Sequence, residues 1–405
     1  MPVRVVTFGC RLNSYESAAI KEMDGSEDDI IVVNTCAVTG EAERQCRQTV
    51  RKLRRENPNA FLVVTGCAAQ IAPDAYAKMP EVDKVLGNNE KLDPNAYKKT
   101  APALSVGDID SPDAPLNAHM PFYFEGRNRA FIQIQQGCDH ACTFCIVTKA
   151  RGKNKSLPPE KIIAHAQKLV DEGYPEIGLT GVDITSYPDL AGLTKRLLKE
   201  VSGLKRLRLG SLDPAAVDDG LIALFADSDI LMPHLHLSVQ SGDDLILKRM
   251  ARRHLRKDVL ELCEKIRTVR PDAVFGADFI TGFPTETERM FENTLDLVRN
   301  ARLTHLHVFP YSVRPGTPAA KMPQVPVPVR KERAKRLRDE GNALLNAYMQ
   351  SRIGSEARVL YETDGKGLCE HYLSVKIGEG FRSGDIIPVR LTGIAETGVF
   401  EGSVL

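Results

Sequence analysis

The loop that decides the fold of this chain reads Gly137-Cys138-Asp139-His140-Ala141-Cys142-Thr143-Phe144-Cys145. It places three cysteines in a C-x3-C-x2-C array directly after a strand-like apolar run, Ala130 to Gln135. Three thiolates on one tight loop can hold three irons of a cubane iron–sulfur cluster and leave the fourth iron open. A structural zinc site would use four ligands, and a ferredoxin cluster would use a fourth local cysteine. The array therefore favours a cluster with an open iron over zinc or inert thiols.

Strand-like and helix-like segments alternate downstream of the array. The predicted strands are Ala130 to Gln135, Glu176 to Thr180, Arg206 to Leu209, His234 to Val239, Ala273 to Ile280 and His305 to Phe309. The predicted helices are Pro159 to Glu172, Leu190 to Val201, Ala215 to Ala226, Lys257 to Val269 and Glu286 to Asn300. Six such units fit a partial barrel better than an eight-unit barrel, which typically needs ~250 residues.

A second group of cysteines lies upstream. The β-branched runs Val3 to Phe8, Asp29 to Asn34 and Ala60 to Thr65 are of the kind that form strands buried on both faces, and they lead into Cys10, Cys36 and Cys67. Helices are predicted over Ser14 to Met23, capped by Asn13 or Ser14, and over Gly40 to Glu56. If the strands are parallel, all three thiols meet at the carboxyl edge of one sheet.

The predicted fold class is α/β, with three units and a linker. We expect an amino-terminal parallel-sheet domain over 1–105, a Pro-rich linker over 106–125 and a partial (β/α)6 barrel domain over 126–345. That domain ends in a charged helix, Val329 to about Gln350. The tail 346–405 has short β-like runs separated by glycines, including Ala357 to Tyr361, Leu373 to Ile377 and Ile386 to Leu391, and is predicted to form a small β-barrel.

The composition is that of an ordinary globular protein. The 405 residues are 42% hydrophobic and 26% charged, and no apolar run approaches the roughly 20 residues that cross a bilayer. We expect a cytoplasmic protein without membrane contact, in which nine cysteines serve as metal ligands or buried thiols rather than disulfides. A formal net charge of +1 does not by itself indicate nucleic-acid binding, so any such prediction must rest on local clusters of charge.

The cysteine array resembles the signature of the radical S-adenosylmethionine (SAM) superfamily. The resemblance implies that Cys138, Cys142 and Cys145 hold a 4Fe-4S cluster whose open iron binds SAM, which is cleaved to a 5′-deoxyadenosyl radical. The side chains that it implies for SAM contact lie in the array or just past later strands: Phe144, Gly181, Asp183, Ser211, Gln240 and Gly282. Each of these residues could instead be an ordinary core, turn or capping residue. The evidence for SAM contact is therefore that they recur at corresponding places after successive strands.

The chain resembles the methylthiotransferase family from end to end. The segments most like the branch acting on threonylcarbamoyl-adenosine 37 of tRNA are Phe8 to Ser17 (FGCRLNSYES), Val33 to Thr39 (VNTCAVT), Thr65 to Gln70 (TGCAAQ), His236 to Gly242, Ile280 to Pro284 and Val308 to Thr317. The resemblance implies a second 4Fe-4S cluster on Cys10, Cys36 and Cys67 and two SAM molecules per turnover. One SAM would donate its methyl group to sulfur, and the other would yield the radical that removes the C2 hydrogen. The tail is similar to the TRAM module.

Local positive charge points to several candidate RNA contacts. Arg151 and Lys153 flank the cysteine loop, and Arg252 and Arg253 lie in the basic run Lys248 to Lys257; Arg330 to Arg338 is a second basic run. A solvated helix face is the alternative for both runs. The TRAM-like tail from Ser351 to Leu405 has six Lys/Arg against eight Asp/Glu, which disfavours a basic RNA-binding face there.

The expected function is a tRNA methylthiotransferase that works with an electron-donor protein. Alternative substrates within the family are isopentenyl-adenosine 37 and a ribosomal-protein aspartate. An iron–sulfur carrier or scaffold is the alternative outside enzymology.

Overall fold

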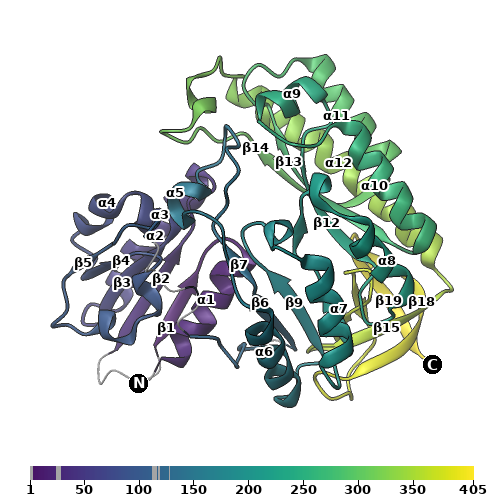
Figure 1. The fold of residues 1–405 in the computed structure, drawn as a ribbon, viewed down its shortest axis with the longest axis horizontal. Coiled ribbons are helices and arrows are strands. Elements are labelled where there is room, and N and C mark those ends of the chain that lie inside the picture. Colours follow the sequence, from purple (N-terminus) through teal and green to yellow (C-terminus); the bar gives the residue numbers. More distant parts are fainter. Residues whose placement is uncertain (1–2, 24–28, 112–115, 117–118, 127) are drawn as a thin grey trace.

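The computed structural model describes residues 3–23, 29–111, 116, 119–126 and 128–405. Residues 112–115 and 117–118 of the predicted linker lie outside the described residues. An amino-terminal α/β unit, a central partial barrel and a small carboxy-terminal barrel follow one another along the chain, from purple through teal to yellow in Figure 1.

The amino-terminal sheet is parallel, with the order β1-β2-β3-β4-β5. Its strands are β1 (Arg4–Thr7), β2 (Ile30–Thr35), β3 (Phe61–Gly66), β4 (Lys84–Leu86) and β5 (Leu104–Ser105). Every residue of β2 is buried, as predicted, whereas β1 has exposed or half-buried residues only. The expectation that β1 is buried on both faces is wrong because β1 is an edge strand with one neighbour. The short strands β4 and β5 were not anticipated.

Helices cover both faces of this sheet. Helix α1 (Arg11–Glu22) places Ala19 and Ile20 against one face, whereas α2 (Gly40–Glu56) places Val50 against the other. The predicted bounds of α2 are confirmed, and Thr39 caps it by accepting from the Ala42 N–H at 3.1 Å. The predicted start of α1 at Ser14 is wrong. The helix begins three residues earlier, with Cys10 as N-cap, because the Ser14 N–H already reaches the Cys10 carbonyl at 3.1 Å.

The central unit is a six-stranded parallel arc, as predicted. Its two ladders, β6-β9-β10 and β11-β12-β13-β14, are joined by a bridge between Leu207 and Leu231. Residues 209–210 alone separate β10 from β11, so these two form one interrupted strand. The strands are β6 (Arg129–Gln133), β9 (Glu176–Thr180), β10 (Arg206–Arg208), β11 (Ser211–Leu212), β12 (His234–Gln240), β13 (Val274–Thr281) and β14 (Leu303–Pro310).

The helices of the arc lie outside it (Figure 1) and are α6 (Pro159–Asp171), α7 (Leu190–Glu200), α8 (Asp219–Asp227), α10 (Arg256–Val269) and α11 (Glu288–Asn300). The predicted start of α8 at Ala215 is wrong. A separate 3-10 turn, η4 (Pro214–Ala216), comes first, and α8 begins where Asp218 accepts from the Leu221 N–H at 2.7 Å. A hairpin of β7 (Gln135–Gln136) and β8 (Lys155–Ser156) brackets the cysteine loop.

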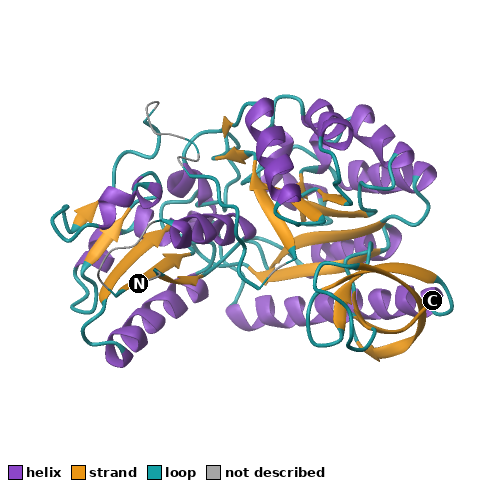
Figure 2. Ribbon diagram, turned by 90° about the horizontal axis from the view of Figure 1, so that it is seen from below, coloured by secondary structure: helices purple, strands orange, loops and turns teal. Residues whose placement is uncertain are grey.

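The carboxy-terminal unit is a closed β-barrel with the order β15-β16-β17-β19-β18, seen end-on near the C label of Figure 2. The long helix α12 (Val327–Arg352) leads into it and contributes Met349 to its core. The strands are β15 (Glu356–Tyr361), β16 (Lys366–Leu368), β17 (Ser374–Lys376), β18 (Ile386–Glu396) and β19 (Val399–Val404). The predicted small barrel is confirmed. Among the described residues, no helix has the length and apolar character needed to cross a membrane.

The carboxy-terminal barrel is attached to the amino-terminal ends of β9 and β10 by buried charge. Glu176 lies 2.8 Å from Arg208 and 3.5 Å from Arg206. Arg206 donates to the Leu368 carbonyl at 2.9 Å, and Arg208 donates to the Cys369 carbonyl at 2.9 Å. The carboxylate of Glu176 therefore stabilises two guanidinium groups that hold the barrel in place.

Tyr372 connects all three units. Its ring stacks on His234 of β12 with centroids 4.8 Å apart, and its hydroxyl accepts from Arg11 of α1 at 2.6 Å. Arg208 lies over the same ring at 5.1 Å from the centroid. The negative face of a tyrosine ring attracts cations, so the contact between Arg208 and Tyr372 helps to hold the carboxy-terminal barrel on the central arc.

We predict that Glu176→Gln destabilises the protein strongly because it leaves Arg206 and Arg208 buried without a countercharge. Loss of one partner of a buried pair costs about 3–5 kcal/mol. The measurement is the free energy of unfolding in urea. The matched control is Glu200→Gln on α7, whose exposed pair with Arg196 should contribute less than about 1 kcal/mol. Equal effects of the two substitutions would contradict the role of Glu176.

Candidate functional site

The C-x3-C-x2-C loop is held at both ends. The Cys138 N–H donates to the Gly152 carbonyl at 3.0 Å, and the Thr143 N–H donates to the Met250 carbonyl at 3.0 Å, at the end of α9 (Asp244–Arg249). Gly137 has φ +73°, and a Cβ there would lie 1.9 Å from the Lys153 carbonyl oxygen. Only glycine fits this position, so the strand can turn directly into the cysteines.

Each sulfur of this trio accepts one N–H. Cys138 accepts from the His140 main chain at 3.4 Å, Cys145 from the Val147 main chain at 3.4 Å, and Cys142 from the Arg252 guanidinium at 3.5 Å. Burial raises the pKa of Cys138 to about 11, so a metal must displace a proton to bind this sulfur. Three half-buried sulfurs with N–H donors fit the ligand set of a cluster with one open iron.

Gln135 joins the cysteine loop to the loop that follows β9. Its side-chain oxygen accepts from the Val182 and Asp183 main chains at 2.9 Å each, and its amide donates to the Gly137 carbonyl at 2.6 Å. A Cβ at Gly181 would lie 2.8 Å from the Gln135 side-chain oxygen, so the two loops meet only because residue 181 is glycine. Asp183 lies 2.8 Å from His140. The structure thus brings Gly181 and Asp183 beside the trio.

The other predicted SAM-contact residues lie in the cysteine loop, at the break between β10 and β11, or at the ends of β12 and β13. Ser211 is exposed at the start of β11, and Gln240 ends β12 with φ 72°, a strained value for a residue other than glycine. Gly282 follows β13 with φ 66°, where a Cβ would lie 2.4 Å from the Arg330 side chain. Phe144 is half-buried, with its ring 6.4 Å from that of Phe283. Their contact with SAM stays a prediction, since Gly282 and Phe144 also have packing roles.

The amino-terminal trio converges at the carboxyl edge of the first sheet. Cys10 caps α1, Cys36 follows β2, and Cys67 begins the short helix α3 (Cys67–Ile71). A Cβ at Gly9 would lie 3.0 Å from the Cys36 sulfur, so this glycine lets the first loop approach the second. Burial raises the pKa of Cys36 to about 12, and the charges of Cys67 and Cys10 add to this shift. The topology alone predicted this convergence.

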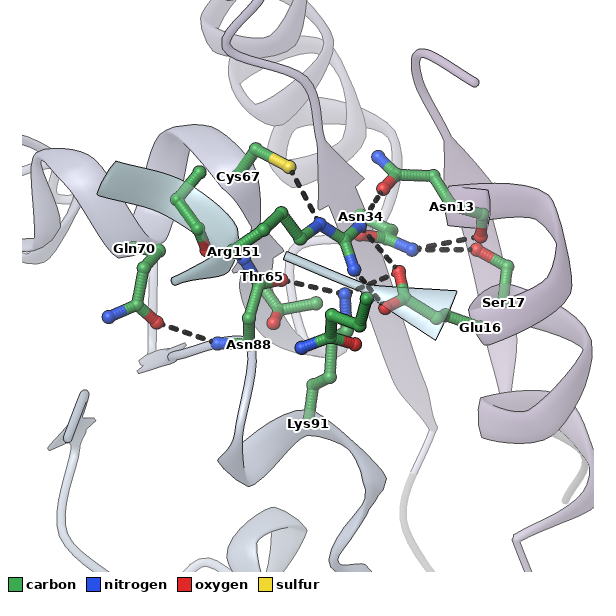
Figure 3. Close-up of polar contacts among 12 residues, drawn as sticks. Asn13, Glu16, Ser17, Asn34, Thr65, Cys67, Gln70, Asn88, Lys91 and Arg151 are labelled. Atoms are coloured by element: carbon green, nitrogen blue, oxygen red, sulfur yellow. Dashed lines mark hydrogen bonds and ion pairs between the residues drawn. The ribbon is translucent and has the colours of Figure 1, made fainter. Parts of the chain in front are cut away.

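A buried charge network, the Arg151 network, lies beside Cys67 of the amino-terminal trio (Figure 3). Arg151 donates to the Cys67 sulfur at 3.3 Å, to Glu16 at 2.8 Å and to Asn13 at 2.5 Å. Lys91 donates to the same Glu16 carboxylate at 2.6 Å. Arg151, Glu16 and Lys91 are 3%, 1% and 0% exposed. Two cations and one carboxylate leave one buried positive charge beside the thiols, which suits an anionic cluster.

One short helix joins the two trios. Helix α5 (Val147–Arg151) begins two residues after Cys145 and ends at Arg151, so at about 1.5 Å per residue it is only about 7.5 Å long. Ile146, just before it, is buried in the core of the amino-terminal unit with Ile31 and Val33. The N–H of Val147 reaches one trio and the guanidinium of Arg151 reaches the other. The two trios are therefore neighbours.

The structure buries two of the four candidate RNA contacts. Arg151 is saturated by buried partners, and Arg252 is tied to the Ser238 carbonyl at 2.7 Å and to Asp213 at 3.4 Å, with 8% of its side chain exposed. Lys153 is exposed, and Arg253 is 46% exposed while it contacts Asp213 at 3.1 Å. In the run Arg330 to Arg338, Arg330 and Arg333 are buried and Arg336 pairs with Glu288, so this part of the run packs on the fold and is not the solvated helix face given as the alternative.

Sequence reasoning missed a polar group on the inner face of the arc. Asp278 of β13 accepts from His236 of β12 at 3.0 Å and contacts His307 of β14 at 3.2 Å. His307 has 61% of its side chain exposed. A Cβ at Gly276 would lie 2.5 Å from the His236 ring, so this glycine makes room for the contact. The alternating polar residues of His234 to Gln240 and Leu303 to Pro310 were the signal available in the sequence.

Comparisons with known proteins agree with this geometry. The family model of the radical SAM superfamily matches residues 132–298, and that of the uncharacterized protein family UPF0004 matches residues 2–87. The solved radical S-adenosylmethionine methyltransferase TsrM from Kitasatospora setae matches with a TM-score of 0.55 and 14% identity, over 76% of this chain and 67% of that one. At that identity the likeness shows the fold alone.

Curated relatives match over nearly the whole chain. The threonylcarbamoyladenosine tRNA methylthiotransferase MtaB of Rickettsia prowazekii is 50% identical over 97% of this chain and 95% of its own. A tRNA-2-methylthio-N(6)-dimethylallyladenosine synthase of Cereibacter sphaeroides is 36% identical over 96% of each chain. Matches of this identity and coverage, together with the radical SAM motif, show that the chain belongs to the radical SAM tRNA methylthiotransferase family, as its cysteine motifs predict.

Proposed function

We propose that this enzyme adds a methylthio group to C2 of N6-threonylcarbamoyladenosine at position 37 of tRNA, using two 4Fe-4S clusters and two SAM molecules. The observation that carries the proposal is the pair of cysteine trios joined by α5. One trio is implied by the radical SAM motif. The second trio has the same number of sulfurs, converges in space and has a buried excess positive charge beside it. A single-cluster enzyme would need none of these features in its amino-terminal unit.

Each trio has its own task in this proposal. Cys138, Cys142 and Cys145 hold the cluster that binds SAM, and Cys10, Cys36 and Cys67 hold the cluster that carries the sulfur to be methylated. When bound, the first cluster and SAM supply a one-electron reductant and a radical able to remove an aromatic hydrogen that no general base can take. The chain's own residues bind and orient: Gln135 aligns the two loops that face SAM, and Arg151 holds Cys67.

The substrate assignment rests on the names of two curated relatives and on the polar inner face of β14. The Rickettsia relative at 50% identity is named for threonylcarbamoyladenosine, whereas the Cereibacter relative named for dimethylallyladenosine is 36% identical. His307 is exposed and is held by Asp278. An imidazole fixed by a carboxylate can hydrogen-bond the carboxyl, hydroxyl or ureido groups of a threonylcarbamoyl substituent, which an isoprenoid group lacks.

We further propose that tRNA approaches with Lys153 and Arg253 among its contacts, that an electron-donor protein reduces the clusters, and that the enzyme works in the cytoplasm, where its tRNA substrate is. The exposure of these two side chains supports the first of these proposals. The iron–sulfur carrier hypothesis gives way to an enzyme, because curated transferases match over nearly the full chain.

The division of labour between the trios predicts different losses for two substitutions. Cys142→Ala should abolish formation of 5′-deoxyadenosine, because it removes an iron ligand at the SAM site. Cys36→Ala should leave some 5′-deoxyadenosine but no methylthio product. Anaerobically reconstituted wild type should hold about eight irons per chain, and each variant about four. Cys263→Ala, which removes a buried thiol elsewhere, is the control. Equal loss of 5′-deoxyadenosine in both trio variants would contradict the assignment.

Nucleoside analysis decides the substrate. Mass spectrometry of tRNA digests from a strain lacking this gene should show loss of the methylthio form of threonylcarbamoyladenosine and accumulation of the unmethylthiolated nucleoside. Loss of methylthio-isopentenyladenosine instead would assign the chain to the alternative tRNA substrate. Intact tRNA nucleosides together with an unmodified ribosomal protein would point to the aspartate substrate.

Arg151→Gln should prevent loading of the amino-terminal cluster. The substitution leaves Glu16 with Lys91 alone and removes the donor to Cys67, and breaking a buried pair costs about 3–5 kcal/mol. The measurement is iron content in a chain whose Cys138, Cys142 and Cys145 are all alanine, so that only the amino-terminal trio binds iron. Lys149→Gln, at an exposed position on the same helix, should retain about four irons. Full iron content in Arg151→Gln would show that the network is not needed for the cluster.

A further inference from the structure

A hollow of about 600 Å³ lies beside helix α2, next to the edge strand β1. Its lining consists of cationic, amide or hydroxyl side chains and one aromatic ring: Phe8, Gln45, Gln48, Thr49, Arg51, Lys52 and Arg55. No carboxylate is among these lining residues. The hollow is therefore positively charged and rich in hydrogen-bond donors, and neither the fold nor the proposed reaction explains it.

The cations of the hollow remain available to a ligand. Arg51 and Lys52 have 53% and 64% of their side chains exposed, and their nearest carboxylates, on Glu81 and Glu56, lie at 3.9 Å and 3.7 Å. Exposed ion pairs at such distances contribute little free energy in water, so the two cations can exchange these carboxylates for a phosphate. Arg55 is exposed and has no ion-pair partner within the part of the chain that the structure describes.

The backbone of Phe8, the aromatic member of the hollow, is held by hydrogen bonds close to a cysteine. The Phe8 N–H donates to the Asn34 carbonyl at 2.9 Å, and the Phe8 carbonyl accepts from the Asn13 side chain at 2.7 Å. Phe8 is two residues before Cys10, so at most about 7 Å of backbone separates the two. One end of the hollow thus adjoins the amino-terminal trio.

We propose that this hollow binds the tRNA backbone beside the target nucleotide. Arg51, Lys52 and Arg55 contact phosphates, the amides and hydroxyl of Gln45, Gln48 and Thr49 contact phosphate and ribose oxygens, and Phe8 stacks on an unpaired base. RNA loops expose unstacked bases that aromatic rings accept, and their phosphates demand closely spaced cations. An acidic protein surface would satisfy the cations alone, whereas the half-buried Phe8 ring, which packs against the amino-terminal core, also gives the hollow an aromatic wall that suits a nucleobase. This inference rests on the proposed function, because it takes tRNA as the substrate.

The test measures binding of a fluorescein-labelled tRNA transcript to the full chain between about 50 and 200 mM salt. The variant combines Arg51→Gln, Lys52→Gln and Arg55→Gln, since glutamine has nearly the helix propensity of arginine and lysine and α2 should persist. The matched control combines Lys195→Gln, Lys199→Gln and Lys205→Gln, three exposed lysines on and just after α7. Circular dichroism melting of both variants verifies that the fold is retained.

We expect the hollow variant to bind tRNA about tenfold or more weakly at low salt, with a dependence of log Kd on log salt that is shallower by about 2, as loss of three single-strand phosphate contacts requires. The control should match wild type. Equal behaviour of the hollow variant and wild type, or equal weakening of both variants, would overturn the inference.

The inference and the proposed function fail in different ways. If the hollow variant binds tRNA like wild type while wild type still methylthiolates tRNA, the inference alone is wrong. If wild type modifies no tRNA nucleoside but the hollow variant alone loses tRNA binding, the binding surface stands and the proposed reaction is wrong.

Discussion

The buried ion pair between Arg151 and Glu16 is the constraint on which the rest of the site depends. It links a helix of the central arc to the first helix of the amino-terminal unit, and both partners are nearly without solvent exposure. Removing such charges from water costs several kcal/mol per ion, so the pair forms only when the geometry of both units is correct. Lys91 and Asn13 complete that geometry, and Cys67 lies within it. The spacing of the two cysteine trios is thereby coupled to the satisfaction of buried charge.

Close backbone approaches at glycines build the remaining geometry. Gly137 lets the strand turn into the first trio, Gly181 lets the next loop meet Gln135, and Gly9 lets the Cys10 loop approach Cys36. At each of these positions a methyl group would collide with backbone or with a side chain that is already fixed. These close approaches let the loops that carry the two cysteine trios pack tightly at the carboxyl edges of two parallel sheets. Parallel strands place the cysteine loops at the same edge of a sheet, and the glycines let these loops approach one another closely.

Much of this arrangement was predictable from the sequence. Hydrophobic periodicity located the strands of the arc and the helix Gly40 to Glu56, and the rule that ligands gather at the carboxyl edge brought Cys10, Cys36 and Cys67 together. Long-range pairing was not predictable. Arg151 looked like a free cation because its partners Glu16 and Asn13 are 135 and 138 positions away along the chain. The strands β4 and β5 have only three and two residues, too few for a periodic pattern. The His236, Asp278 and His307 group arises from register between strands, which periodicity does not reveal.

The contact between Arg11 and Tyr372 has a consequence for the order in which the molecule is made. These residues are separated by 361 positions, and Arg11 directly follows the first cysteine of the amino-terminal trio. At roughly 5–20 residues per second, a ribosome needs about 20–70 s to synthesise the intervening chain. During that time Arg11, the residue next to Cys10, lacks its hydrogen bond to the Tyr372 hydroxyl. The residue next to Cys10 therefore gains this contact only after the segment that carries Tyr372 has been synthesised.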